Sequence, residues 1–147
     1  AKKHLADSAQ AITKEYRDKD IRAYVSVNKA LVTQASAAIP VVPLYLSILY
    51  RVMKKMNLHE GCIEQMDRLY MDKVYGANGV LVESDGLIHV DDYELREDVQ
   101  KQVMDIWENI NSDNLSELAD LDGYWDDFYH MFGFKVDGVD YSLDVEP

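Results

Sequence analysis

The sequence predicts an α/β protein in which one buried strand of a parallel sheet is followed mainly by helices. Residues 22–27 are rich in β-branched and aromatic side chains and carry little charge, which is typical of a short strand buried in a parallel sheet. Small and hydroxylated residues follow at 32–39, at the carboxyl end of that strand. Pro40 and Pro43 then interrupt any helix, and an apolar helix begins near residue 44.

Helical spacing of apolar side chains predicts the elements on either side of the strand. Residues 1–16 form a helix, and residues 17–20 are a solvated connection. One face of this first helix consists of Leu5, Ala9, Ile12 and Tyr16. The helix at 44–56 has an apolar side made of Ile48, Leu49, Val52, Met53 and Met56.

A further helix and a hairpin are predicted in the middle of the chain. Residues 58–75 form the helix, with Cys62, Met66 and Leu69 on its apolar face. Two short β-branched stretches flank a turn at Gly86 and predict a small β-hairpin over residues 80–90.

The last part of the chain is predicted to be helical, followed by an irregular tail. Asp91 or Asp92 caps a helix that runs to residue 110. Its apolar stripe consists of Val99, Val103, Ile106 and Ile110. Ser112 or Asp113 begins a shorter helix, and another at 122–131 ends at Gly133. Residues 134–147 are expected to lie irregularly along the surface.

These elements are too few for a self-sufficient α/β domain. A buried parallel strand needs a neighbour on each side, and no second parallel strand is evident in the sequence. We therefore expect the chain to be the carboxyl-terminal part of a larger protein whose remaining sheet lies upstream.

Composition narrows the class of protein. With 147 residues, 48% of them hydrophobic and 29% charged, the chain can build a core and is not disordered. The longest apolar run, at 37–50, is too short to span a bilayer and contains two prolines, so no membrane is expected. The single cysteine, Cys62, cannot form an internal disulfide, which favours a cytoplasmic location.

Charge is distributed unevenly along the chain. Residues 1–56 hold ten Lys and Arg against four Asp and Glu, a net charge of +6, whereas residues 57–147 hold five against 23, a net charge of −18. An anionic ligand is therefore favoured near the strand, while nucleic acid is not expected as a partner. The acidic half is interpreted as a solubilising surface.

Metal and cysteine chemistry are not supported by the spacing of the candidate ligands. His59 and Cys62 lack a third or fourth converging ligand, so no metal site is expected. We expect Cys62 to be a buried structural thiol, because it falls on the apolar stripe of its helix. The acidic stretches around Gly123 and Gly138 do not fit a calcium-binding loop.

The hydroxylated turn after the strand is the strongest candidate for a binding site. Thr33, Gln34 and Ser36 lie at the edge of a parallel sheet where ligands bind. The same side chains could serve only to form the turn, and local physics leaves both interpretations open. Lys2 and Lys3 could likewise be ordinary exposed helix lysines.

Several stretches of this sequence resemble one enzyme family. They are residues 25–45, Val-Met-Lys-Lys at 52–55, His-Glu-Gly-Cys-Ile-Glu-Gln at 59–65, Glu-Leu-Arg-Glu-Asp-Val-Gln at 94–100 and Gly-Val-Asp-Tyr at 138–141. The chain closely resembles the carboxyl-terminal part of the NADH-dependent trans-2-enoyl-CoA and enoyl-acyl-carrier-protein reductases. This resemblance implies that residues 1–56 end a Rossmann-like, short-chain-dehydrogenase-like domain and that residues 57–147 form a helical extension.

The resemblance also implies roles for individual residues. Lys2 matches the lysine of the family's Tyr-x8-Lys pair, whose tyrosine lies upstream of Ala1. Leu31, Val32 and Thr33 match a stretch that contacts NAD. A lid over the substrate's acyl chain is expected to include Ser36, Ile39, Pro40 and Tyr45.

The implied function is NADH-dependent reduction of an enoyl thioester in bacterial fatty acid biosynthesis. The enzyme is expected to be a cytoplasmic monomer, and this polypeptide alone is expected to be inactive. The alternative is a noncatalytic acidic helical module that binds other proteins.

Overall fold

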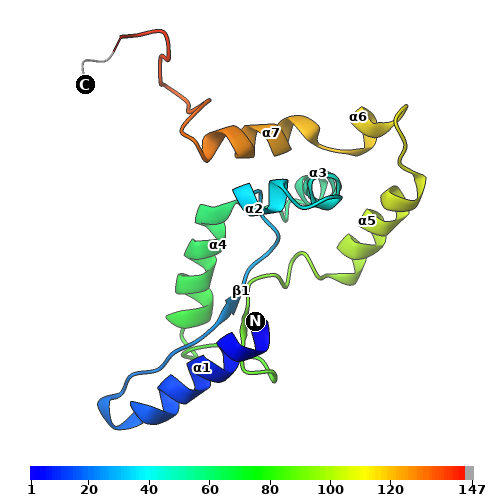
Figure 1. Cartoon of the computed structure of the whole chain (residues 1–147). Coiled ribbons are helices and arrows are strands. Elements are labelled where there is room, and N and C mark those ends of the chain that lie inside the picture. The colour runs from blue at the N-terminus through cyan, green and yellow to red at the C-terminus, as the bar shows by residue number, and fades with distance from the viewer. Residues whose placement is uncertain (145–147) are drawn as a thin grey trace. The chain divides into compact units, whose positions relative to one another are not determined.

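The computed structural model describes residues 1–144 and shows a mostly helical protein with one two-stranded parallel sheet (Figure 1). The chain forms two compact units, each built from two separate stretches of sequence. Unit 1 comprises residues 1–30 and 60–97, and unit 2 comprises residues 31–59 together with the described residues from 98 onward. None of the described helices is both long enough and apolar enough to cross a membrane.

Unit 1 contains the helices α1 and α4, two short helical segments and both strands. Its elements are α1 (Lys2–Glu15), the 3-10 turn η1 (Arg17–Lys19), β1 (Ser26–Val27), α4 (Cys62–Arg68), the π-helical η2 (Leu69–Val74) and β2 (Ile88–His89). The first helix and the strand near residue 27 are confirmed, although the strand is only two residues long.

The predicted β-hairpin is wrong, because β2 pairs with β1 in parallel. Ser26 lies opposite Ile88, and the Ile88 amide donates to the Val25 carbonyl at 3.0 Å. The turn itself exists, with Gly86 at a φ of 82°. Pairing with β1 buries Ile88 and Val90 against Leu69, which an isolated hairpin would not achieve. One neighbouring strand, which sequence analysis did not find, therefore lies within this chain.

A buried arginine ties the segment after β2 to α4. The Arg68 guanidinium donates to both carboxylate oxygens of Glu60, to Asp92 and to the Val90 carbonyl, each at 2.7 Å. It also lies 4.0 Å from the centre of the Tyr93 ring. Asp92 therefore does not cap the following helix.

Asp91 is likewise engaged elsewhere, since its carboxylate bonds to the His89 ring at 2.8 Å. The predicted capping by Asp91 or Asp92 is wrong for this reason, and the helix begins at Glu97 instead.

Cys62 is exposed, so the prediction of a buried thiol is also wrong. The buried side of α4 consists of Gln65 and Arg68, two polar residues whose side chains face the interior of unit 1. Cys62 is the first residue of this helix, and its neighbour Ile63 is 77% exposed. The buried face of α4 was misassigned because it carries polar rather than apolar side chains.

Unit 2 is organised around one apolar helix. Its elements are α2 (Gln34–Ala37), α3 (Val42–Lys55), most of α5 (Glu97–Asn109), α6 (Leu115–Leu118) and α7 (Leu121–His130). The middle of α3 is almost entirely buried, through Leu46, Ile48, Leu49, Tyr50, Val52 and Met53. Helix α7 packs against α3, as Figure 1 shows.

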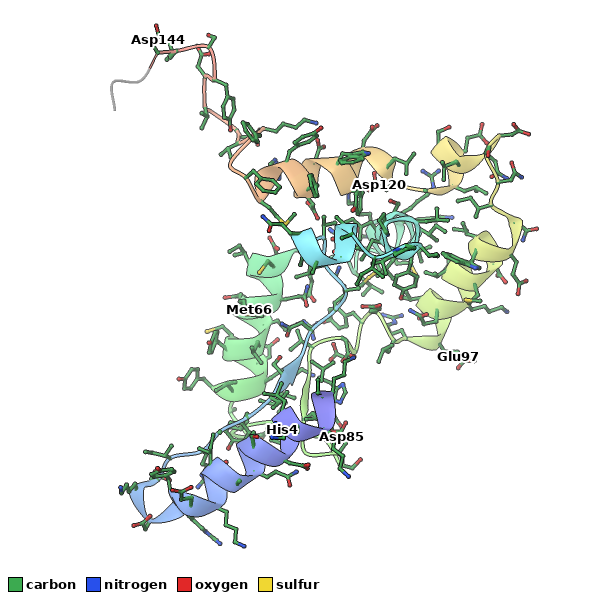
Figure 2. All side chains as sticks on the ribbon, in the orientation of Figure 1. His4, Met66, Asp85, Glu97, Asp120 and Asp144 are labelled. Carbon is green, nitrogen blue, oxygen red and sulfur yellow. The ribbon has the colours of Figure 1, made fainter. Side chains whose placement is uncertain are left out.

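The predicted stripe of α5 is confirmed at Val99 and Val103, which are fully buried. Asp120 precedes α7 and its side chain accepts a hydrogen bond from the Gly123 amide, which caps that helix (Figure 2). Gly133, at a φ of 76°, follows the end of α7 as predicted.

The start of the short helix was predicted too early. It begins at Leu115 after Asn114, rather than at Ser112 or Asp113. Residues 134–144 contain no helix or strand and are exposed, as predicted, and residues 145–147 lie outside the described part of the chain.

Candidate cofactor site

The segment that joins β1 to α2 carries most of the predicted site residues. It runs from Asn28 to Thr33, immediately beyond the carboxyl end of β1. In parallel sheets this edge is where ligands bind, because the strand ends and loop backbone groups become available there.

Two side chains of unit 1 hold the beginning of this segment. The Lys29 amide donates to Gln65 Oε1 at 2.9 Å, and the Ala30 amide donates to Glu94 Oε2 at 2.7 Å. The Lys29 ammonium donates to the Ala30 carbonyl at 3.0 Å. Lys29, Gln65 and Glu94 are 2%, 0% and 7% exposed, so these contacts are shielded from solvent. Sequence reasoning missed all three residues.

The predicted donors Thr33 and Ser36 form a capping box at the start of α2. The Ser36 amide donates to Thr33 Oγ1 at 3.0 Å, and the Thr33 amide donates to Ser36 Oγ at 2.7 Å. The Ser36 hydroxyl is also within 3.1 Å of the Leu31 carbonyl. These side chains therefore shape the turn, which was one of the two interpretations that the sequence left open.

Tyr50 of α3 holds the middle of the same segment. Its hydroxyl oxygen accepts a hydrogen bond from the Val32 amide at 3.3 Å. Burial raises the pKa of Tyr50 well above its ordinary value, and the nearby charge of Asp127 raises it further. The hydroxyl is therefore protonated at any physiological pH.

Two backbone groups of the segment remain open. Within the described residues, no hydrogen bond reaches the amide of Leu31 or the carbonyl of Val32. An open donor and an open acceptor in neighbouring residues suit a ligand that presents both kinds of group, such as a carboxamide.

The predicted lid residues precede and begin α3. Ile39 is 51% exposed, and Pro40 is exposed as well. Tyr45 is partly buried, and its hydroxyl accepts a hydrogen bond from Gln100 at 3.3 Å. Val41, which sequence reasoning did not select, has a φ of 74°, a conformation that disfavours β-branched residues. It is 58% exposed, so an apolar surface continues from Ile39 to Val41.

Lys2 is the first residue of α1 and is exposed. It belongs to unit 1, whereas Leu31, Val32 and Thr33 belong to unit 2. The structure brings Thr33 and Ser36 together, and it places Lys2 at an accessible helix terminus.

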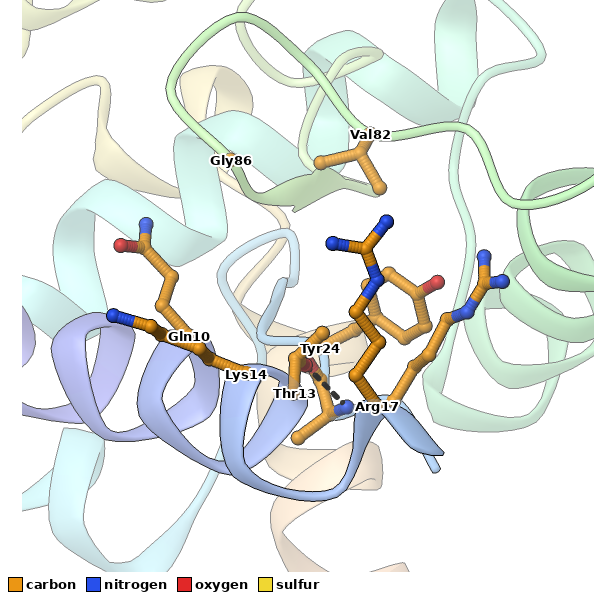
Figure 3. Close-up of a pocket in the computed structure, with 9 residues that line it drawn as sticks. Gln10, Thr13, Lys14, Arg17, Tyr24, Val82 and Gly86 are labelled. Atoms are coloured by element: carbon orange, nitrogen blue, oxygen red, sulfur yellow. Dashed lines mark hydrogen bonds between the residues drawn. The ribbon is translucent and has the colours of Figure 1, made fainter. Parts of the chain in front are cut away.

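A pocket lies at the other end of α1 from Lys2 (Figure 3). It has a volume of about 530 Å³, and its lining includes Lys14, Arg17 and Arg22. The Thr13 hydroxyl oxygen accepts a hydrogen bond from the Ala23 amide at its base, at 2.8 Å. Lys14 lies twelve residues beyond Lys2, or about 18 Å along the helix axis, so this basic pocket is separate from the Lys2 terminus.

Comparison with known proteins identifies relatives over the whole chain. Residues 1–75 match the family model described as the trans-2-enoyl-CoA reductase catalytic region, and residues 82–145 match the one described as the enoyl reductase FAD binding domain. An enoyl-[acyl-carrier-protein] reductase [NADH] of Cytophaga hutchinsonii is 54% identical over 145 residues. A trans-2-enoyl-CoA reductase [NADH] of Brachyspira hyodysenteriae is 54% identical over 147 residues.

Solved structures agree with these sequence relatives. A crystal structure of the Clostridium acetobutulicum trans-2-enoyl-CoA reductase in complex with NAD superimposes with a TM-score of 0.94 at 49% identity. The Treponema denticola enzyme in complex with NAD gives a TM-score of 0.91 at 48% identity. These alignments cover 99% and 98% of this chain, but only 38% and 36% of those chains.

The curated relatives show the same proportion. The matches cover 99% of this chain and 37% or 38% of the Cytophaga and Brachyspira proteins, so the chain spans little more than a third of their length. The resemblance inferred from the quoted motifs is thereby confirmed, and the chain belongs to the trans-2-enoyl-CoA reductase family.

Proposed function

We propose that this chain is the carboxyl-terminal part of an NADH-dependent reductase that saturates the trans-2 double bond of enoyl-CoA or enoyl-acyl-carrier-protein thioesters. The observation that carries the proposal is the match of 99% of the chain, at a TM-score of 0.94, to a reductase solved in complex with NAD. Bacterial fatty acid biosynthesis is the metabolic setting that fits this chemistry.

In this proposal the open backbone groups of the β1–α2 segment orient the cofactor. The Leu31 amide and the Val32 carbonyl hold its carboxamide end, and the Thr33 hydroxyl contacts it from the start of α2. NADH, when bound, supplies a hydride to the β-carbon of the enoyl thioester. The other steps depend on side chains that manage charge and exclude water.

Negative charge develops on the thioester oxygen as the β-carbon is reduced. The tyrosine that the resemblance places upstream of Ala1 donates a hydrogen bond or a proton to this oxygen. The Lys2 ammonium favours the tyrosine's phenolate form after the proton has left, and it also holds the ribose of the cofactor. Ser36, Ile39, Pro40 and Tyr45 cover the acyl chain.

The domain assignment belongs to the same proposal. Residues 1–56 end the Rossmann-like NAD-binding domain with its lid, and residues 57–147 form the helical extension. Parallel pairing of β1 with β2 supports an α/β arrangement, in which the extension contributes the strand Ile88–His89. Among the described residues β1 has a single neighbour, which leaves its second edge for strands supplied by the rest of the protein.

A flavin does not fit the part of the chain whose family model is described as FAD-binding. Residues 82–145 contain eighteen Asp and Glu against three Lys and Arg. A pocket of about 340 Å³ in this part is lined by Glu83, Asp85, Asp91 and Asp92, and its lining includes no lysine or arginine to bind a pyrophosphate. The proposed reaction therefore has no flavin step.

The proposal places the enzyme in the cytoplasm as a monomer. An exposed thiol at Cys62 without a disulfide partner supports a reducing compartment.

The test uses the chain joined to its natural upstream sequence. Loss of NADH absorbance is followed with crotonyl-CoA as substrate, and the Lys2→Ala variant is compared with wild type. We expect kcat/KM to fall by about 10²-fold or more, since a charge close to the reacting oxygen is lost. Lys14→Ala is the matched control, because Lys14 is an exposed lysine of the same helix, and it should retain full activity.

Absence of NADH consumption by the folded wild-type protein, across enoyl chain lengths, would exclude the reductase and leave the noncatalytic helical module.

A further inference from the structure

We propose that Lys29, Gln65 and Glu94 are positioning residues that aim the open Leu31 amide at the cofactor and thereby set the affinity for NADH. This inference rests on the proposed function, because it assumes that residues 31–33 contact NADH. None of the three side chains needs to touch the cofactor, since each acts on the backbone that leads into the contact segment.

Planarity of the peptide bond connects the contacts of Lys29 to the open amide. The Ala30 carbonyl and the Leu31 amide belong to one planar trans unit, so fixing the carbonyl also fixes the direction of the N–H. The Lys29 ammonium fixes that carbonyl at 3.0 Å. A charged donor in a buried setting makes a strong hydrogen bond, so this peptide plane has little freedom to rotate.

The open Val32 carbonyl is fixed in the same way from the other side. It shares a peptide plane with the Thr33 amide, which donates to Ser36 Oγ at 2.7 Å. Each open group therefore shares its peptide plane with a backbone atom that is held by a side chain. For the Leu31 amide this atom is the Ala30 carbonyl oxygen, and for the Val32 carbonyl it is the Thr33 amide nitrogen. Each of the two open groups is therefore held by contacts within its own unit before any ligand binds, which lowers the entropy lost on binding.

Gln65 and Glu94 hold the two amides that precede this arrangement. Gln65 Oε1 and Glu94 Oε2 accept from Lys29 and Ala30, which are consecutive residues. The two acceptors come from α4 and from the stretch after β2, so both are far in sequence from the Lys29 and Ala30 amides that they bind. The path of the backbone beyond β1 is thus set by side chains rather than by sheet hydrogen bonds.

The choice of glutamine at position 65 is explained by this contact and not by packing. Gln65 is fully buried, and within the described residues its Nε2 has no hydrogen-bond partner. A buried amide donor without a partner is unfavourable, and leucine would fill a similar volume without that cost. The acceptor function toward Lys29 is what leucine cannot supply.

The experiment measures the dissociation constant of NADH by fluorescence titration, together with the KM values of NADH and crotonyl-CoA, in the full-length enzyme. Gln65→Leu removes the acceptor and keeps the volume. We expect NADH to bind about five- to tenfold more weakly, because one buried hydrogen bond is lost, and we expect the KM of crotonyl-CoA to be unchanged. A second pair of variants keeps the test decisive if Gln65→Leu folds poorly. Glu94→Leu should weaken NADH binding, whereas Glu94→Gln, which keeps an acceptor oxygen, should bind NADH as wild type does.

Thr13→Val is the matched control. Thr13 accepts from the Ala23 amide at 2.8 Å, so it is also a side-chain acceptor that holds backbone next to β1, but at the opposite end of the strand. It should lower thermal stability and leave NADH affinity at the wild-type value.

Wild-type NADH affinity in folded Gln65→Leu and Glu94→Leu would overturn the inference while leaving the reductase intact. An equal loss of NADH affinity in Thr13→Val would show a general loss of stability and would also overturn it. Failure of wild-type enzyme to consume NADH would instead reject the proposed function.

Discussion

The interiors of the two units are built by different means. Unit 2 is organised around α3, whose buried residues are almost all apolar, whereas unit 1 buries Lys29, Gln65, Arg68, Asp91 and Glu94 beside a small apolar cluster. An apolar interior tolerates small shifts of its members, because dispersion and hydrophobic forces have little directionality. A polar interior fixes atoms in particular directions, which suits the unit that holds the Lys29 and Ala30 amides beyond β1.

The largest expected effect tests the apolar interior of unit 2. Leu49 is fully buried in α3, and Leu49→Ala should lower the free energy of unfolding by about 4 kcal/mol, through lost transfer energy and a residual cavity. Leu95→Ala is the control, because that side chain is 58% exposed, and its effect should stay within about 0.5 kcal/mol. Urea unfolding measures both, and equal effects would contradict the assignment of this core.

The next effect tests the polar interior of unit 1. Arg68→Ala removes the bidentate partner of Glu60 and leaves Asp92 with Lys73 alone, and we expect a loss of about 3 kcal/mol in unfolding free energy. Arg22→Ala is the control, since Arg22 is exposed and pairs with an exposed Asp20 at 3.6 Å, and it should have almost no effect. A neutral result for Arg68→Ala would mean that the polar cluster contributes nothing to stability.

The smallest effect is a dependence of stability on pH at His89. The His89 ring is hydrogen-bonded to Asp85 and Asp91. These bonds, with the larger contribution from Asp85, raise the pKa of His89 above its ordinary 6.5. Protonated His89 therefore stabilises the folded state fully below pH 6.5, and this contribution is lost as pH rises through the raised pKa.

Thermal unfolding between pH 6 and pH 8 checks this prediction. Wild type should lose more stability over this range than His89→Asn, which cannot titrate. Parallel pH profiles for the two proteins would show that the His89 contacts carry no pH-dependent stability.

The sequence was sufficient to predict a helix and its buried face where the buried side chains are apolar. The stripe of α3 and the pair Val99 and Val103 on α5 follow helical spacing, so α3 and the end of α5 were predicted within a few residues, although α5 begins later than predicted, at Glu97. The α4 helix shows the opposite case. Its buried residues Gln65 and Arg68 are polar, so the apolar pattern around Cys62 indicated the wrong face.

Long-range pairing was also outside the reach of local patterns. The Asp85-Gly86 turn correctly indicated a change of chain direction, but it could not reveal that the next strand joins β1 in parallel. Thr33 and Ser36 were identified because hydroxyl residues after a strand form a local signal. Gln65 and Glu94 were missed because nothing in their immediate neighbourhood indicates that they reach Lys29 and Ala30.

The pairing of β1 with β2 has a consequence for how the chain acquires its structure. Val27 and His89 are separated by about sixty residues, so their contact closes a long loop, and contacts of this kind slow folding. That loop contains α2 and α3, while α3 itself packs against α7, which is made much later. Each unit needs residues from two separate stretches of the sequence, so α3 is synthesised well before the α7 helix that packs against it.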